Sequence, residues 1–464
     1  MILERLSTFV ERVRQSAMLY GAVGTVVRVG ANVLLLPVVL KKLSIPEQRL
    51  WWVFLALGAI GNLADFGFGQ AISRVYSYLW AGAEDFDTEG LRPPPANSEP
   101  NRPRLQQLHA AARLLYSRLA LGASALMVAA GSWFVMEPAR ACENPVQVWV
   151  AWAGYVVVVA CNVAWAHWMF ACQGTNRMRE LQASFMWSGL SYLVCASALL
   201  LLGWGVFAMV VATLVRGFVI RQMNAVAFRK VVPPIHGAHS PVDRTILRRL
   251  WPNARKFGVL SAGVYFIYSG PILVCSEFLG ASVTASYGLT AQVGMFIANF
   301  SALWLAVKWP QITILRTQGR LEEMAVLFAR RLACLIGSFV VLAALLVLSG
   351  DRFLEWKGSG TRLLPTAHLV VYLLYLGQQQ VYAQFGTLTF TENVVPFFWV
   401  SLWTGLGLVA LCLVLTPWLG LWGLVLAPLL ATLACSSWYP IWRGFRGQPL
   451  TVPQFLRAAV RGRL

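Results

Sequence analysis

The sequence predicts an all-α, polytopic membrane protein with about twelve transmembrane helices arranged as two six-helix bundles. Two observations predict this fold class. Hydrophobic residues make up 58% of the 464 residues, whereas charged residues make up only 12%. Apolar runs of nearly 20 residues recur along the whole chain, so the bilayer, rather than one soluble core, must be the solvent for most of this surface.

Hydropathy places the individual spans and divides them into two groups. The expected spans are 17–40, 50–72, 116–136, 146–171, 182–203, 205–225, 257–279, 283–307, 331–349, 365–388, 395–416 and 420–441. A basic polar stretch follows the sixth span. We therefore expect an amphipathic interfacial N-terminus at 1–16, a first bundle at 17–225, a basic cytoplasmic linker at 226–256, a second bundle at 257–441 and a basic cytoplasmic tail at 442–464.

The basic residues predict orientation rather than nucleic-acid binding. The formal net charge is +19, but the Lys and Arg residues lie between apolar runs and form no single basic patch. Placing both termini in the cytoplasm puts most of them on the inner side of a bacterial cytoplasmic membrane. The residues expected on the outer side are Lys41, Lys42, Arg49, Arg140, Arg352, Lys357 and Arg362.

Neither a metal centre nor an enzyme active site is predicted. The eight Cys residues are scattered without a C-x-x-C pair, and most lie in or beside apolar runs. His236 and His239 are one helical turn apart, but no Cys or carboxylate cluster accompanies them, so we expect a solvated loop. The longest outer loop, near 351–364, is too short to carry catalysis. We expect no metal and no cofactor.

Basic side chains within the spans are the most informative residues for function. Each costs about 2.5 to 3.5 kcal/mol at the bilayer centre, so it normally faces a wet cavity or a partner. Several arginines around one cavity would bind a phosphate through bidentate hydrogen bonds. We favour such a cavity for Arg28 and Arg216. Arg74, Arg118 and Lys308 lie near span ends, where extension of the side chain towards the interface is an open alternative.

Acidic and amide side chains supply the other candidates. Asp65 and Glu277 are candidates for coupling to a cation or proton, although each could instead be an interfacial charge or a helix cap. Glu392 is more simply a solvated charge. Gln380 and Gln384 share one helix face, where they would contact sugar hydroxyls or make interhelical hydrogen bonds.

Three segments resemble the polysaccharide transporter branch of the multidrug, oligosaccharidyl-lipid and polysaccharide exporter superfamily, which includes O-antigen flippases. The first comprises "LLLPVVLKKLS" and "WWVFLALGAIGNLADFGFGQAISR". The second is "ILVCSEFLGASVTASYGLTAQV", and the third is "WPQITILRTQGRLEEMAVLFARR". The family often has an Asp before the apolar part of its seventh helix, where this chain has Ser269, Gly270 and Pro271, so no cation site is carried over there.

The resemblance implies a transporter that works by alternating access. Its substrate would be an undecaprenyl-diphosphate-linked oligosaccharide, moved to the outer leaflet for lipopolysaccharide, O-antigen or exopolysaccharide biosynthesis. Arg28, Arg74 and Arg216 would hold the diphosphate and sugar, while the polyprenyl tail stays among membrane lipids. A proton or sodium gradient would reset the transporter. Other polysaccharide assembly proteins are the implied protein partners.

Three other readings compete with the flippase. A multidrug antiporter of the same superfamily would bind organic cations through acids in its cavity. A major facilitator transporter also has two six-helix halves, but "GNLADFGFGQ" lacks the basic pair of that family's loop motif. A polysaccharide polymerase or ligase would need a large outer loop for its catalytic residues. Deep bases outnumber deep acids here, which favours an anionic substrate.

Overall fold

The structure is a computed structural model that describes residues 24, 30–31, 34–83, 99–142, 144–233, 244–391 and 397–461. Several predictions fall on other residues. Arg28, Glu392, His236, His239, the interfacial N-terminus and most of the first expected span lie outside the described residues.

The predicted fold class is confirmed: the chain is an all-helical, multi-pass membrane protein. The described ranges contain helices and no strands. Nine of these helices are long and apolar enough to cross a membrane, and a bent helix pair raises the number to ten. The expected span at 365–388 is also a helix, but its Gln residues make it less apolar than those nine.

The chain divides into two compact units. The first contains Leu57–Ser261, and the second contains Ser44–Ala56 together with Ala262–Leu464. The bundle limits expected from hydropathy, 17–225 and 257–441, stay a prediction for the membrane-embedded parts.

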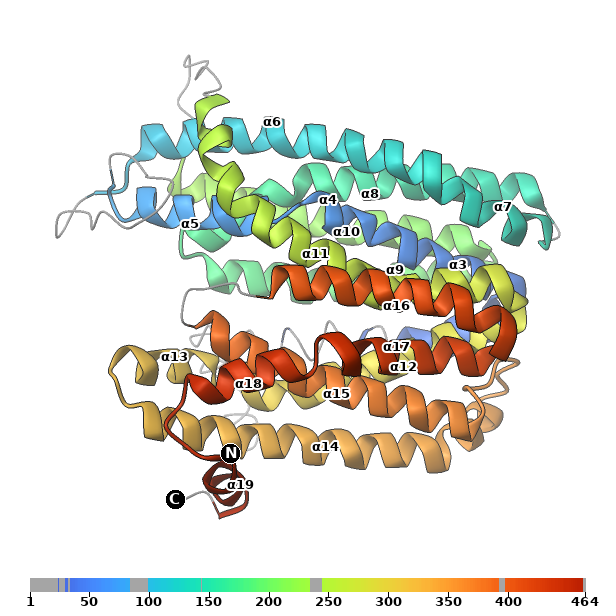
Figure 1. Cartoon of the computed structure of the whole chain (residues 1–464). Helices are drawn as coiled ribbons and strands as arrows, with labels where there is room; N and C mark the ends of the chain where they lie inside the picture. Colours follow the sequence, from blue (N-terminus) through green and yellow to red (C-terminus); the bar gives the residue numbers. More distant parts are fainter. Residues whose placement is uncertain are drawn as a thin grey trace, which may run out of the picture. The chain divides into compact units, whose positions relative to one another are not determined.

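The first unit is built around one long helix, α8. This helix packs against α4, α5, α6, α7, α9 and α10, and the long antiparallel rods of α6 and α8 are visible in Figure 1. The helices of this unit are α4 (Ile60–Ala64), α5 (Phe68–Trp80), α6 (Arg102–Leu126), the π-helical turn η1 (Met127–Gly131), α7 (Ser132–Arg140), α8 (Pro145–Gly174), α9 (Met178–Leu201) and α10 (Gly205–Val231).

The second unit is built from α12, α14, α15, α16 and α17. Helix α15 packs against α12, α14, α17 and α18, and α16 packs against α17. The bounds are α12 (Gly280–Ala306), α13 (Trp309–Thr317), α14 (Leu321–Trp356), α15 (Thr366–Phe390), α16 (Phe398–Leu419), α17 (Leu421–Cys435), α18 (Trp438–Arg446) and α19 (Val452–Arg461). Two helices have residues in both units: α3 (Ile45–Gly58) and α11 (Arg244–Phe278).

The second expected span, 50–72, is broken in the middle. Helices α3 and α4 are bent from α5 by 43°. Phe66 and Gly67 have φ values of 46° and 75°, a left-handed conformation that interrupts helical hydrogen bonding. A Cβ on Gly67 would lie 2.2 Å from the Cβ of Phe257, so only glycine fits this position. The break leaves Asp65 between two helix ends.

Arg49 corrects one sequence expectation. We expected it in an outer loop, but α3 begins at Ile45, and Arg49 is only 2% exposed within the second unit. Its Nε donates to the hydroxyl of Ser276 at 3.0 Å, and a terminal nitrogen donates to the Ser276 carbonyl. Because the helix begins about one turn earlier than expected, Arg49 is buried instead of lying at the surface. Its hydrogen bonds to Ser276 hold α3 to α11.

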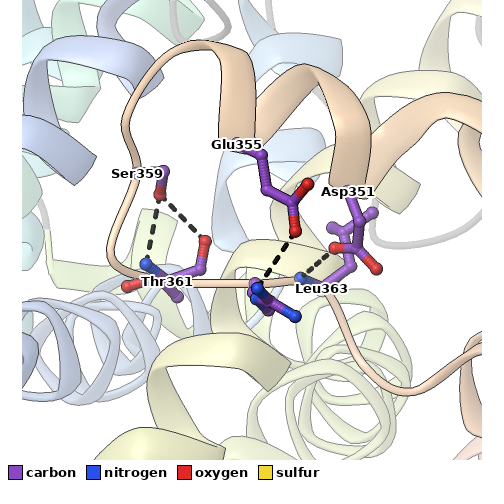
Figure 2. A network of polar contacts seen from close by, with 6 residues as sticks. Asp351, Glu355, Ser359, Thr361 and Leu363 are labelled. Carbon is purple, nitrogen blue, oxygen red and sulfur yellow. Dashed lines mark hydrogen bonds and ion pairs between the residues drawn. The ribbon is translucent and has the colours of Figure 1, made fainter.

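The expected outer loop at 351–364 is also shorter than predicted, because α14 continues to Trp356. Figure 2 shows how this loop is closed. The Asp351 carboxylate accepts from the Leu363 N–H at 3.0 Å, and Glu355 forms an ion pair with Arg362 at 3.0 Å. The Thr361 hydroxyl donates to the Gln48 side-chain oxygen at 2.7 Å, which fastens the loop to α3.

Candidate functional site: a polar pocket beside a broken helix

A cavity of about 360 Å³ opens beside the helix break in the first unit. Helices α3, α4, α6, α8 and α10 contribute to its wall. One wall is apolar. The polar lining residues are Asn62, Asp65, Tyr116, Tyr155, Asn162 and Thr213.

Asp65 is the negative charge in this pocket. Its carboxylate accepts a hydrogen bond from the Tyr116 hydroxyl and another from the Gly69 N–H, at 3.2 Å to Oδ1. Gly69 lies in the first turn of α5, where the partial positive charge of a helix N-terminus stabilises an anion. Within the described ranges, Asp65 has no ion-pair partner. The carboxylate is therefore positioned but not neutralised.

Asn162 places a further oxygen in the same pocket. Its Oδ1 is buried, and no described residue donates a hydrogen bond to it. A Cβ on Gly217 would lie only 1.7 Å from this oxygen, so glycine on α10 makes room for the amide. The Thr213 hydroxyl donates to the Met209 carbonyl at 2.7 Å and keeps lone pairs available. Carboxylate, amide and hydroxyl oxygens together suit a proton or a hard cation.

Arg216 lies close to this pocket on α10. Its guanidinium is 5.7 Å from the centroid of the Tyr192 ring and interacts electrostatically with Tyr155, which lines the pocket. Arg216 is half-buried in a helix apolar enough to span a membrane. Among the residues that the structure describes, no carboxylate forms an ion pair with it. Of the two predicted residues, Asp65 lines the pocket, whereas Arg216 does not line it and interacts with the lining residue Tyr155.

Arg221 is a candidate that sequence reasoning missed. It lies on α10, 5.5 Å from the centroid of the Trp165 ring, and its Nε is buried with no partner among the described side chains. We expected this span to end at 225, which left Arg221 near its end. The helix continues to Val231, so Arg221 lies well inside it. The apolar residues on both sides of Arg221 were the sequence signal that could have placed it inside the span.

The remaining predicted site residues do not line this pocket. Arg74 is exposed on α5, and Glu277 is exposed near the end of α11. Lys308 precedes α13 and donates to the Gln311 side chain at 3.1 Å. Gln380 is half-buried and Gln384 is buried, both on α15. These residues lie on α5, α11 and α15 and directly before α13.

The neighbouring Gln378 illustrates the alternative role proposed for the glutamines. Its amide donates to the hydroxyl of Ser437, and its side-chain oxygen accepts from the hydroxyl of Thr432 at 3.4 Å. These bonds join α15 to the end of α17. At this position, a glutamine within a span makes an interhelical contact.

No family model and no curated protein matches the sequence. Solved structures do match over nearly its whole length. The lipid II flippase MurJ in an inward closed conformation has a TM-score of 0.64 at 10% identity, covering 96% of this chain and 90% of that chain. The MATE multidrug transporter DinF-BH has a TM-score of 0.64 at 12% identity, covering 96% of both chains. This chain has the MOP superfamily fold.

Other MOP-fold structures extend the comparison. A mutant of the Vibrio cholerae MATE transporter VcmN has a TM-score of 0.61 at 12% identity, covering 94% of this chain and 97% of that chain. These structures are transporters and a flippase rather than enzymes. At such low identity the similarity shows the fold alone. The substrate must be inferred from the residues of this chain.

Proposed function

We propose that the chain is a flippase that moves an undecaprenyl-diphosphate-linked oligosaccharide across the bacterial cytoplasmic membrane by alternating access. It would serve surface polysaccharide biosynthesis, with both termini in the cytoplasm. The observation that carries this proposal is the half-buried Arg216 in a membrane-spanning helix, which no described carboxylate neutralises.

The energetics of Arg216 favour an anionic ligand. An arginine at the bilayer centre costs about 2.5 to 3.5 kcal/mol. Its contact with the Tyr192 face returns about 0.5 to 2 kcal/mol, which leaves the charge only partly compensated. A diphosphate offers the bidentate hydrogen bonds and the opposite charge that the aromatic ring cannot. Arg221 lies in the same helix and adds a second cation of the same kind.

The Asp65 pocket would supply the coupling. Protonation or Na⁺ binding at Asp65 would change the charge of a pocket whose Tyr155 also interacts with Arg216. The cation and the anionic substrate could then favour different facing states. An ion gradient biases the exchange only through such a difference in affinity.

The second candidate is a cation-coupled multidrug antiporter, which the MATE structures favour at the level of the fold. Its substrate would be an organic cation, and Asp65 is the acid in the first-unit pocket that could attract it. The uncompensated arginines of α10 oppose a cationic substrate. The resemblance of three segments to polysaccharide transporters favours the lipid-linked anion.

The experiment is a leaflet-exchange assay in proteoliposomes with a fluorescent prenyl-diphosphate sugar. Arg216→Ala should slow transport at least about tenfold, the loss expected for one charge-assisted contact. Arg216→Lys should recover only part of it, because lysine cannot bind bidentately. Arg28→Ala, at another of the arginines predicted to bind the diphosphate, should also slow transport.

Arg229→Ala is the matched control. Arg229 also lies on α10 with its guanidinium 5.1 Å from a ring centroid, that of Trp168, but it is exposed near the helix end. This variant should transport at nearly the wild-type rate. Equal rates for Arg216→Ala and wild type would refute the proposed role of Arg216. Transport of an organic cation, with none of the lipid diphosphate, would establish the antiporter instead.

A further inference from the structure

The second unit contains a cavity of a different kind. Its volume is about 190 Å³, and residues of α3, α11, α12 and α15 line it. Five aromatic side chains dominate the lining: Trp52, Tyr268, Tyr287, Tyr372 and Tyr375. Among the residues that the structure describes, no charged side chain lines this aromatic pocket.

Two polar atoms of the aromatic pocket make no hydrogen bond. Trp52 is 5% exposed and Tyr375 is 3% exposed, yet the Trp52 Nε1 and the Tyr375 hydroxyl have no partner among the residues that the structure describes. Buried polar groups are normally hydrogen-bonded, and an exception calls for a physical reason. Both residues line the same pocket, and a ligand that reached the two polar atoms would satisfy them.

The walls of the aromatic pocket are tightly packed. The Trp52 ring lies against α12 at Gly288, where a Cβ would come within 2.4 Å of the Trp52 Cγ. The Tyr287 and Tyr372 rings meet edge to face with their centroids 5.7 Å apart. The centroid of the Tyr375 ring lies 6.1 Å from that of Tyr372. These contacts keep the pocket from collapsing. They also hold the faces and edges of the rings at fixed positions around it.

The chemistry of the lining selects the ligand. Drug-sized ligands occupy pockets of about 300 Å³ or more, so this cavity suits a single ring. The indole N–H can only donate a hydrogen bond and needs an acceptor oxygen. A quaternary ammonium ion could lie against the aromatic faces but offers no acceptor. A sugar ring offers apolar C–H faces for the aromatic rings and hydroxyl oxygens for Trp52 and Tyr375.

We infer that the aromatic pocket binds one neutral sugar ring of the transported lipid, through the Trp52 N–H and the Tyr375 hydroxyl. The inference rests on the proposed function, because only that function makes the sugar a part of the transported lipid. The pocket would favour the sugar-bearing lipid, because a lipid diphosphate without sugar would leave both polar groups without a partner. Ser269 and Gln292 also line the pocket and offer further hydrogen-bonding groups.

The first test uses a neutral alkyl glucoside below its micelle concentration, titrated calorimetrically into the full-length protein in lipid nanodiscs. Tyr375→Phe and Trp52→Phe each remove a polar atom and keep an aromatic ring. Each should weaken binding about three- to tenfold, as expected for one lost hydrogen bond. Tyr439→Phe removes a hydroxyl from α18 in the same unit, outside the aromatic pocket, and should bind like wild type.

Two results would overturn the inference. One is an alkyl glucoside affinity that is absent in the wild type or unchanged in both aromatic variants. The other is binding of tetraethylammonium that Tyr375→Phe and Trp52→Phe weaken, with no binding of the glucoside.

A second titration separates this inference from the proposed function. It compares a prenyl diphosphate carrying one hexose with the same lipid lacking the sugar. Tyr375→Phe should reduce the preference for the sugar-bearing lipid, whereas Arg216→Ala should weaken both lipids equally. If neither lipid binds but the glucoside still does, with sensitivity to Tyr375→Phe, the proposed function fails and the sugar site stands. If both lipids bind and Tyr375→Phe leaves their ratio unchanged, the sugar site fails alone.

Discussion

The pockets of the two units have chemically different linings. The first-unit pocket contains a carboxylate and an unsatisfied amide oxygen, with an arginine that interacts with one of its tyrosines. The aromatic pocket of the second unit is lined mainly by Trp and Tyr, with no charged side chain from the described part of the chain. A single substrate with both a diphosphate and a sugar requires both kinds of recognition. In our proposals, the first unit would recognise the charge and the second unit would recognise the ring.

Local sequence explains the contrast. In the first unit, α8 and α10 contribute small polar residues within apolar runs, among them Asn162 and Thr213. In the second, α12 and α15 place Tyr287, Tyr372 and Tyr375 on their buried faces. Tyrosine combines a large apolar area with one polar atom, so it can line a pocket without introducing charge.

The largest expected effect concerns the acid that distinguishes the first-unit pocket. Asp65→Asn keeps the side-chain shape and can still accept from Tyr116, but it removes the charge. Gradient-driven transport should fall about a hundredfold, the upper range of coupling between sites, while equilibrium exchange falls much less. Proteoliposomes with and without an ion gradient provide the measurement.

Glu277→Gln, at the other acid that the sequence predicts as a coupling candidate, is the comparison for this prediction. Glu277 is exposed on α11 and lines neither pocket. Its variant should transport normally under both conditions. If Asp65→Asn and Glu277→Gln respond alike to the gradient, Asp65 has no special role in coupling.

The next effect concerns how α3 is held in the second unit, where it carries Trp52. Arg49→Met should lower the free energy of unfolding by about 2 to 3 kcal/mol, because charge-assisted hydrogen bonds to Ser276 are lost. Ser276→Ala removes only the hydroxyl and should cost about 1 kcal/mol. Thermal unfolding in detergent measures both. Lys41→Met, at an exposed position, should be neutral, and a similar loss there would contradict the buried role of Arg49.

A methyl group can test the wall of the aromatic pocket. Gly288→Ala places a Cβ against the Trp52 ring and should destabilise the protein by about 1 to 3 kcal/mol through overpacking. It should also weaken alkyl glucoside binding. Gly407→Ala, on α16, meets open space and should be neutral or slightly stabilising. Equal unfolding temperatures for the two variants would show that Trp52 does not rest on Gly288.

The smallest effect is expected at the surface, in the loop of Figure 2. Glu355→Gln removes an ion pair with Arg362 whose side chains are 56% and 71% exposed. Exposed pairs contribute about 0 to 1 kcal/mol, so neither unfolding nor transport should change measurably. A large loss of transport would mean that this loop takes part in substrate handling, a role that neither pocket requires.

Sequence patterns predicted the helices well because a span needs only a sufficient run of apolar residues. They also singled out Asp65 and Arg216, since a charge in such a run is costly wherever the helix is placed. They misplaced Arg49, whose partner Ser276 is 227 residues away in the chain. They also missed Tyr116, Asn162 and Arg221, because an amide, a tyrosine or an arginine near a span end gives no periodic signal of what it faces.

The sequence by itself determined a multi-pass helical membrane protein and the residues whose charge makes them expensive to bury. Hydrophobic length and charge are properties of a segment, so they can be read along the chain. Only the tertiary structure decided that Tyr116 meets Asp65, and that Trp52 and Tyr375 line one cavity with unsatisfied polar atoms. Those relations depend on which helix faces meet, and residues far apart in sequence supply them.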